Sequence, residues 1–372
     1  MKFKSIILAA GAAAVLVSCG QVNEVTEISG TVVPDGISEV NVIVGELVDT
    51  LVPVLDGKFS VTVPADVTVL GTVSAANYGA NFISDGTPLE IVLDVETEVI
   101  SKYPRVSVQD RFNRYNAEEE VLMDEYKAAQ ERIYTDSLST DEQKREKFEE
   151  FFDEFEDRYY GHHKQACVDN KDNFIAVFAL SNLRGQIDDE DIVELVDMLI
   201  PVLQENEYVK GIKEALIARL ETSEGKMFKD FTVNSVVGQT RSVPPQPKYA
   251  EVKLSDYVGK GKYILLDFWS PWCGPCRREM PNIKAVYDKY KGENFDVVSI
   301  AVWERQPVEV TIETAAKLEM TWNQINNGQR EPAALYGVEG IPHLILFGPD
   351  GTILKRGFHG AEIEEVVSSY LK

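Results

Sequence analysis

Cysteine and histidine are scarce in this sequence, with four residues of each among 372. Only Cys273 and Cys276 lie close together, whereas Cys19 and Cys167 are isolated. A closed zinc site needs four ligands, and no second C-x-x-C or Cys/His pair supplies the remaining two. His163 stands four residues before Cys167 on an expected helix, but nothing nearby completes a site, so Cys167 is expected to be a partly buried lone thiol. We expect no metal and no other cofactor.

Positive charge is also in short supply. Lys and Arg number 37 against 61 Asp and Glu, a net charge of −24. Residues 22–100 hold one basic residue against 13 acidic ones, residues 101–224 hold 16 against 30, and residues 225–372 hold 18 of each. Because no basic stripe is available to neutralise phosphates, nucleic acid is not an expected partner.

Long apolar runs are missing after the first few residues of the chain. Residues 6–17 form a short apolar run behind Lys2 and Lys4, which is typical of a signal peptide and too short to span a bilayer. The run ends in LVSCG, which resembles the lipobox of bacterial lipoproteins. The resemblance implies that residues 1–18 are removed and that Cys19 then carries acyl chains. An ordinary cleaved signal with an incidental cysteine is the alternative.

A lipid on Cys19 implies an exported protein that is anchored in a membrane of the bacterial cell envelope and faces the periplasm. More than one acyl chain is enough for stable anchoring. Gly20 and Gln21 follow the cysteine, where an Asp would resemble an inner-membrane retention signal. The outer membrane is therefore expected rather than the inner one.

The remaining chain divides into three segments by its hydrophobic pattern. Residues 19–107 alternate in strand fashion, with Asp-Gly turn signals at 35–36, 56–57 and 85–86, and predict a small antiparallel β-sandwich or barrel. Residues 108–224 change to a helical period, and their aromatic stripe is expected to be the packing face of amphipathic helices. The fold class is thus multidomain, with a β domain, a helical middle domain and an α/β domain at 225–372.

The C-terminal segment reads as strands alternating with helices. The apolar runs KYILLDFWS and FDVVSIAVW suit strands that are buried on both faces, and CRREMPNIKAVYDKY between them is helical. A further helix, a hairpin around residues 349–351 and a closing helix complete the order β-α-β-α-β-β-α. The cysteine pair stands at the first strand-to-helix junction, at the carboxyl end of a strand, where open α/β sheets bind their ligands.

Two stretches carry a specific resemblance. YILLDFWSPWCGPC resembles the active-site segment of thioredoxins, and GIPHLILFGPDGTIL resembles their cis-proline loop and the hairpin after it. The longer arrangement over about 226–372 is similar to the TlpA/ResA-like branch of the thioredoxin superfamily. It implies a thioredoxin fold, a redox-active Cys273–Cys276 disulfide and thiol-disulfide oxidoreductase activity.

The resemblance also assigns roles around the dithiol. Cys273 is the nucleophile, since a helix N-terminus stabilises its thiolate, and Cys276 is the resolving cysteine. Gly274 and Pro275 form the spacer that tunes the thiolate. Trp272 shields the pair and offers an apolar docking surface, whereas Trp269 is expected to pack in the core.

Other residues are candidates for supporting roles. Asp267 lies in an apolar strand and is either a general base with a raised pKa or a hydrogen-bonded structural residue. Glu279 matches a glutamate frequent in the TlpA-like branch, with a solvated helix position as the alternative. The Ile341–Pro342 bond is expected to be cis and to present the backbone of Ile341 to a substrate strand. His343 is expected to be structural.

The predicted function is that of a membrane-tethered thiol-disulfide oxidoreductase of the envelope, in the reductase direction. Its partners are protein or small-molecule disulfides and dithiols, and an envelope redox partner. Two alternatives stay open. One is a peroxide reductase of the same superfamily, in which Ser270 would stand for a Thr but Leu266 replaces the expected Pro. The other is a binding lipoprotein whose N-terminal domains recognise a partner.

The lipobox generates a first prediction. Cys19→Ala removes the only sulfur that can be acylated there, so the protein should move from the membrane fraction to soluble or unprocessed forms. Fractionation of exporting cells followed by immunoblotting measures this. Unchanged fractionation of the variant would contradict lipidation.

Overall fold

The computed structural model describes residues 24–33, 36–75, 78–94, 100–102, 107–239, 241 and 246–371. The predicted signal peptide and Cys19 lie outside these residues. The chain divides into two compact units, Met1–Leu183 and Arg184–Lys372. This division falls inside the predicted helical segment, and the domain boundaries after 107 and 224 stay predictions. No helix in the described part of the chain is long and apolar enough to cross a membrane.

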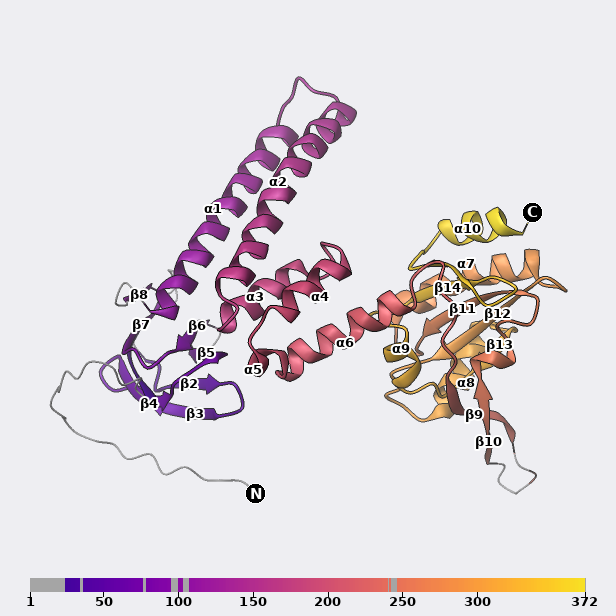
Figure 1. Ribbon diagram of the computed structural model, residues 1–372, viewed down its shortest axis with the longest axis horizontal. Helices are drawn as coiled ribbons and strands as arrows, with labels where there is room; N and C mark the ends of the chain where they lie inside the picture. The colour runs from indigo at the N-terminus through magenta and orange to yellow at the C-terminus, as the bar shows by residue number, and fades with distance from the viewer. Residues whose placement is uncertain are drawn as a thin grey trace. The chain divides into compact units, whose positions relative to one another are not determined.

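Two four-stranded sheets form the β part of the first unit within the described residues (Figure 1). Their strand orders are β4-β1-β7-β8 and β3-β2-β5-β6. Neighbouring strands are antiparallel except β1 and β7, which run parallel. The strands are β1 (Val25–Val33), β2 (Glu39–Val44), β3 (Val48–Pro53), β4 (Lys58–Pro64), β5 (Asp66–Ala75), β6 (Tyr78–Ser84), β7 (Leu89–Asp94) and β8 (Ile100–Lys102).

The two sheets share one apolar core, which makes this part a β-sandwich. Every second side chain is buried along β1 and β2, as the alternating sequence predicts. Side chains from both sheets meet in this core, among them Ile28 and Ile91 from one sheet and Val42 and Phe82 from the other.

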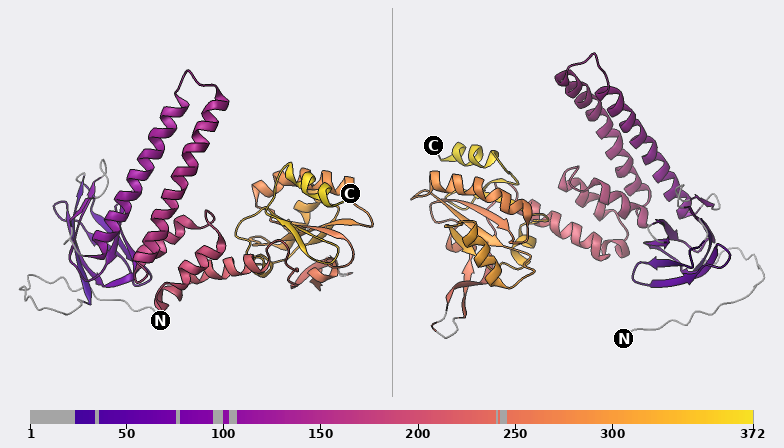
Figure 2. Two further views of the ribbon diagram at one scale, coloured as in Figure 1. Left: turned by 45° about the horizontal axis from the view of Figure 1, so that its top comes forward. Right: turned by 180° about the vertical axis from the view of Figure 1, so that it is seen from behind.

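Three helices complete the first unit: α1 (Val108–Tyr134), α2 (Asp141–Asp169) and α3 (Phe174–Leu183). Thr140 and Gln143 form a capping box that starts α2. The aromatic stripe packs α1 against α2, with the ring of Tyr126 5.2 Å from that of Phe155 between centroids. Figure 2 shows α1 and α2 side by side along their length. The stripe is therefore a packing face, as predicted.

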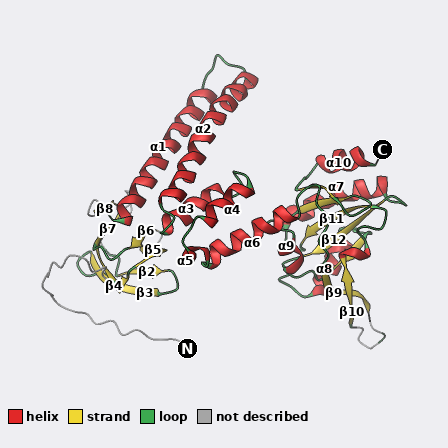
Figure 3. Cartoon of the chain, in the orientation of Figure 1, coloured by secondary structure: helices red, strands yellow, loops and turns green. Residues whose placement is uncertain are grey.

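The second unit begins with helices and continues as an α/β fold (Figure 3). Its helices are α4 (Asp189–Asp197), α5 (Pro201–Gln204), α6 (Glu207–Glu221), η1 (Leu254–Asp256), α7 (Gly274–Tyr290), α8 (Val308–Lys317), α9 (Glu331–Leu335) and α10 (Glu362–Tyr370). Its strands are β9 (Thr232–Gln239), β10 (Pro247–Lys253), β11 (Tyr263–Trp269), β12 (Phe295–Ala301), β13 (Asn323–Ile325), β14 (His343–Phe347) and β15 (Ile353–Arg356).

A five-stranded sheet of order β13-β12-β11-β14-β15 is the centre of the second unit. β11, β12 and β13 are parallel, and β14 and β15 are antiparallel to their neighbours. Alternate residues of β11 point to opposite faces: Leu265 and Trp269 pack with α7 and α10, whereas Leu266 packs on the other side with Phe231 and Tyr336. The predicted β-α-β-α-β-β-α order is present. β13 and α9 are additions, inserted between α8 and β14, and the β9–β10 hairpin precedes the fold.

Candidate active site

Cys273 and Cys276 lie at the junction between β11 and α7. They are joined by a disulfide, and Cys273 is the N-cap of the helix. The backbone N–H of Cys276 donates to the Cys273 Sγ at 3.1 Å. Pro275 occupies the first turn, where a missing N–H costs nothing because these donors have no partner within the helix. The sulfur of Cys273 thus lies at the positive end of the helix dipole, which stabilises a thiolate after reduction.

The spacer between the cysteines is open and lies beside a positive charge. A Cβ at Gly274 would have only one neighbouring group, the guanidinium of Arg278 at 3.5 Å. A cation beside the start of the helix adds to the stabilisation of a thiolate. The sequence pattern gives no signal for Arg278, since it is one of two arginines on the exposed side of α7.

The loop before β14 meets the dithiol from the other side. The Ile341–Pro342 peptide bond is cis. The carbonyl oxygen of Ile341 lies 3.6 Å from the Cys273 Sγ. Both Ile341 and Pro342 are half-buried, and Cys273 is buried beside them.

The two tryptophans of the motif have different environments. Trp269 is fully buried in the core beneath α7. Trp272 is 36% exposed, its indole N–H donates to the Trp303 carbonyl at 3.1 Å, and the Arg305 guanidinium lies 4.2 Å from its ring centroid. Trp272 is thus an exposed aromatic surface held next to Cys273. Trp303 and Arg305, which sequence reasoning missed, lie in the loop after β12.

Asp267 is fully buried and has no ion-pair partner among the described residues. It stands between Leu265 and Trp269 on β11, so it points to the face that packs against α7 and the cysteines. Its Oδ2 accepts from the Ser299 hydroxyl at 2.7 Å, and its Oδ1 has no hydrogen-bond partner within the described residues. Burial, opposed by the Ser299 hydrogen bond, raises the pKa of Asp267 to about 7.

Glu279 is half-buried on α7. Its Oε1 accepts from the Asn282 side chain at 2.8 Å and from the Gly360 backbone N–H at 3.0 Å, which links α7 to the loop before α10. Its negative charge contributes to the raised pKa of Asp267. No contact brings it to the disulfide.

Ser270, which would replace the threonine of a peroxide reductase, is buried, and its hydroxyl donates to the Val302 carbonyl at 2.9 Å.

His343 lies with its Nε2 3.3 Å from the Arg356 guanidinium, and burial together with this positive charge lowers the pKa of His343 to about 3. His343 is therefore a neutral packing residue. Arg356 had no signal in the sequence.

The remaining thiol lies in the first unit, whereas the dithiol belongs to the second. Cys167 is buried in the first unit, and burial raises its pKa to about 12, which makes the thiol unreactive. His163 accepts from, or donates to, the Tyr115 hydroxyl at 2.7 Å, and its pKa is lowered to about 4 by burial. No cluster of three or more His, Cys, Asp or Glu side chains that could hold a metal is found in the described residues.

The disulfide lies at the N-terminus of α7, just after the carboxyl end of β11, and faces a cis-proline loop. This arrangement defines a thioredoxin-fold redox domain. The AhpC/TSA family model matches residues 225–356. Thiol-disulfide oxidoreductase ResA of Geobacillus thermodenitrificans is 30% identical over 148 residues, 40% of this chain and 76% of that protein, and ResA of Bacillus thuringiensis subsp. konkukian is 26% identical over 149 residues, with the same coverage. Through this region the chain belongs to the ResA-like thiol-disulfide oxidoreductases of the thioredoxin superfamily.

Solved structures cover the same part of the chain. The thioredoxin domain of a thiol-disulfide oxidoreductase from Bacteroides vulgatus is 24% identical, with a TM-score of 0.34, and spans 40% of this chain and 99% of that one. A thiol-disulfide oxidoreductase from Bacteroides fragilis is 23% identical, with a TM-score of 0.32, and spans 39% of this chain and 100% of that one.

The pKa of Asp267 generates a prediction about stability. A carboxyl with a folded pKa of about 7, raised from an unfolded value near 4, binds a proton in the folded state that the unfolded state has lost over that range. Its contribution to the free energy of unfolding is complete below pH 4 and falls by up to about 4 kcal/mol as the pH rises to 7. Asp267→Asn should remove this loss. The stability of the variant relative to the wild type should therefore increase as the pH rises from 4 to 7.

Denaturant unfolding followed by tryptophan fluorescence measures this difference, because the four tryptophans of the chain all lie in the second unit. Glu293→Gln, at an exposed position of the same unit, is the matched control. A stability difference between Asp267→Asn and the wild type that stays constant with pH would contradict the raised pKa.

Proposed function

We propose that this protein is a membrane-tethered thiol-disulfide oxidoreductase of the cell envelope that reduces disulfides with its Cys273/Cys276 dithiol. The observation that carries the proposal is the disulfide at the start of α7, with the Ile341 carbonyl oxygen 3.6 Å from the Cys273 Sγ. This arrangement combines a stabilised sulfur with an accessible backbone edge, which is what disulfide exchange with a peptide requires.

In the first step the Cys273 thiolate attacks one sulfur of the substrate disulfide. A mixed disulfide forms between Cys273 and the substrate, and the other substrate sulfur leaves as a thiolate. The Cys276 N–H, which donates to the Cys273 Sγ in the oxidised protein, favours negative charge on the attacking sulfur. The apolar face of Trp272 is the neighbouring surface against which a substrate would pack.

In the second step Cys276 resolves the mixed disulfide. Its thiol must lose a proton before it attacks the Cys273 Sγ, and Asp267 on the same face of the sheet is the candidate acceptor. A carboxyl with a pKa of about 7 is suited to taking up a proton near neutral pH. The Cys273–Cys276 disulfide then forms, the substrate leaves with both sulfurs reduced, and two electrons have passed from the protein to the substrate.

The direction and location of the reaction rest on the sequence. The CGPC spacer resembles that of reducing thioredoxins, and the LVSCG lipobox supports attachment through Cys19 to an envelope membrane, with the outer membrane favoured. After each turnover the disulfide must be reduced again, so a dithiol partner within the envelope is required. The buried Ser270 hydroxyl, already bound to a carbonyl, gives no support to the peroxide-reducing alternative.

The two sulfurs have distinct expected phenotypes. Cys276→Ser keeps the nucleophile but cannot resolve the intermediate, so mixed disulfides with substrate should accumulate. Cys273→Ser should trap almost nothing, and Cys167→Ser should turn over at the wild-type rate because that thiol is buried and unreactive. Non-reducing electrophoresis of the three variants from an exporting host, with and without reductant, measures the adducts. Adducts on Cys273→Ser alone would reverse the roles.

Asp267→Asn tests the proton acceptor separately. The variant should slow resolution of the mixed disulfide by about tenfold or more, while the initial attack changes little, since general-base catalysis contributes about 10²–10⁴-fold. Stopped-flow fluorescence resolves the two steps, with Trp269 and Trp272 as reporters. Equal slowing of both steps, or of neither, would assign Asp267 a structural role.

A further inference from the structure

Residues 336–343, which run from the end of α9 to the first residue of β14, carry the backbone that faces the dithiol. Its Ile341 carbonyl oxygen is the group 3.6 Å from the Cys273 Sγ. In the proposed function a substrate peptide pairs with this backbone. Whatever holds residues 336–343 in place therefore determines how a substrate meets the sulfur.

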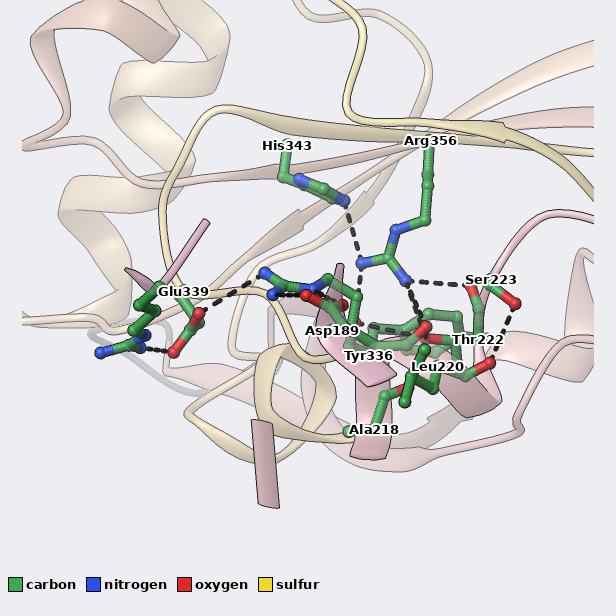
Figure 4. A network of polar contacts seen from close by, with 11 residues as sticks. Asp189, Ala218, Leu220, Thr222, Ser223, Tyr336, Glu339, His343 and Arg356 are labelled. Atoms are coloured by element: carbon green, nitrogen blue, oxygen red, sulfur yellow. Dashed lines mark hydrogen bonds and ion pairs between the residues drawn. The ribbon is translucent and has the colours of Figure 1, made fainter. Parts of the chain in front are cut away.

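One arginine holds both ends of this segment (Figure 4). The Nη2 of Arg356, on β15, donates to the Tyr336 carbonyl at 2.8 Å and lies 3.3 Å from the His343 Nε2. Tyr336 begins the segment and His343 ends it. The rigid, planar guanidinium fixes the directions of its N–H donors, whereas the donors of a lysine ammonium rotate freely.

The other side of the same guanidinium binds the end of α6. The Nη1 of Arg356 donates to the Thr222 carbonyl at 2.9 Å and to the Thr222 hydroxyl oxygen at 2.8 Å. Thr222 is the C-cap of α6 and is fully buried. The free carbonyls at a helix C-terminus carry partial negative charge, so they suit a half-buried cation such as Arg356.

The middle of the segment is held by the same helices. Glu339 forms ion pairs with Arg184 and with Arg219, the latter at 3.6 Å, and Arg219 also pairs with Asp189. Arg184 precedes α4, Asp189 starts it, and Arg219 is in the last turn of α6. In Figure 4 Glu339 lies at one end of this network and Arg356 at the other.

Packing reinforces the polar contacts. Gly337 has a φ of 58°, and a Cβ there would lie 2.4 Å from the Ala215 carbonyl oxygen and 2.6 Å from the Arg219 nitrogen. The backbone of the segment therefore rests directly on the backbone of α6. Only glycine permits both the left-handed conformation and this approach.

We propose that residues 184–222 are a working part of the redox domain, and that Arg356 and Glu339 are positioning residues through which α4 and α6 hold the substrate-docking segment against the dithiol. The inference rests on the proposed function. It extends the functional unit beyond the residues 225–356 that the AhpC/TSA family model matches. The helices act on substrate docking, not on the chemistry of the sulfur itself.

The test compares Arg356→Met and Glu339→Gln in the full-length chain with a matched control, Lys355→Met. Lys355 is the preceding residue on β15, and its exposed side chain makes a single surface ion pair with Glu224. Insulin, with dithiothreitol as reductant, is the disulfide substrate. Alkylation of the reduced protein by iodoacetamide measures the Cys273 thiolate without a docked peptide.

Both variants should raise the KM for insulin by about tenfold or more, because a displacement near 1 Å in a docking site costs up to about 10²-fold. The alkylation rate and its pH profile should stay at the wild-type values, and Lys355→Met should match the wild type in both assays. An unchanged KM in Arg356→Met and Glu339→Gln would overturn the proposal. So would a parallel fall in insulin reduction and alkylation, because a general loss of structure would produce it.

A second measurement stands apart from catalysis. Hydrogen exchange at the backbone amides of residues 337–341 should quicken by about tenfold in both variants, with the amides of α7 unchanged. Glu339→Gln leaves the Arg356 guanidinium in place. If Arg356→Met fails to fold, Glu339→Gln is therefore the variant that tests the proposal. If the wild type does not reduce insulin, the proposed function fails. The hydrogen-exchange rates alone then test the positioning role, and unchanged rates in both variants would overturn it.

Discussion

The unpaired N–H groups at the start of α7 are the feature on which the rest of the redox site depends. β11, buried on both faces, ends at Trp269, and the chain must then turn into a helix whose first donors have no partner within it. Cys273 occupies the capping position, so its sulfur accepts one of those donors. The same interaction that caps the helix therefore favours the thiolate over the thiol.

Asp267 lowers the stability of the folded protein. A carboxyl in the middle of an apolar strand, with one oxygen unpartnered among the described residues, destabilises the folded protein whenever it is ionised. Ser299 and, behind it, the indole N–H of Trp322 at 2.8 Å offset only part of this. The polar residue is understandable if the buried second cysteine has to exchange a proton with a group that solvent does not reach.

The second unit is larger than a bare thioredoxin fold. α4 and α6 contribute Arg184, Asp189, Arg219 and Thr222 to a network that ends on the segment facing the dithiol. A substrate-docking loop is made of backbone groups, and backbone cannot hold its own position without partners. Arg356 supplies such a partner to the Tyr336 carbonyl, and the Thr222 carbonyl at the end of α6 in turn holds Arg356.

Local patterns in the sequence predicted the thiol-disulfide oxidoreductase class and the position of the cysteine pair at a strand-to-helix junction. WCGPC after a buried strand and Gly-Ile-Pro before another are local patterns whose geometry follows from chain connectivity, and the alternation along β1 and β2 and the aromatic stripe of α2 likewise predict their packing faces. Their surroundings follow from long-range contacts: the pairing of β1 with β7 in parallel, the burial of Asp267, Arg305 over the Trp272 ring, and the hydrogen bonds from Arg356 on β15 to Thr222. These contacts join residues up to 134 positions apart. Their strength depends on burial and on distance, and neither quantity is written in the local pattern of a chain.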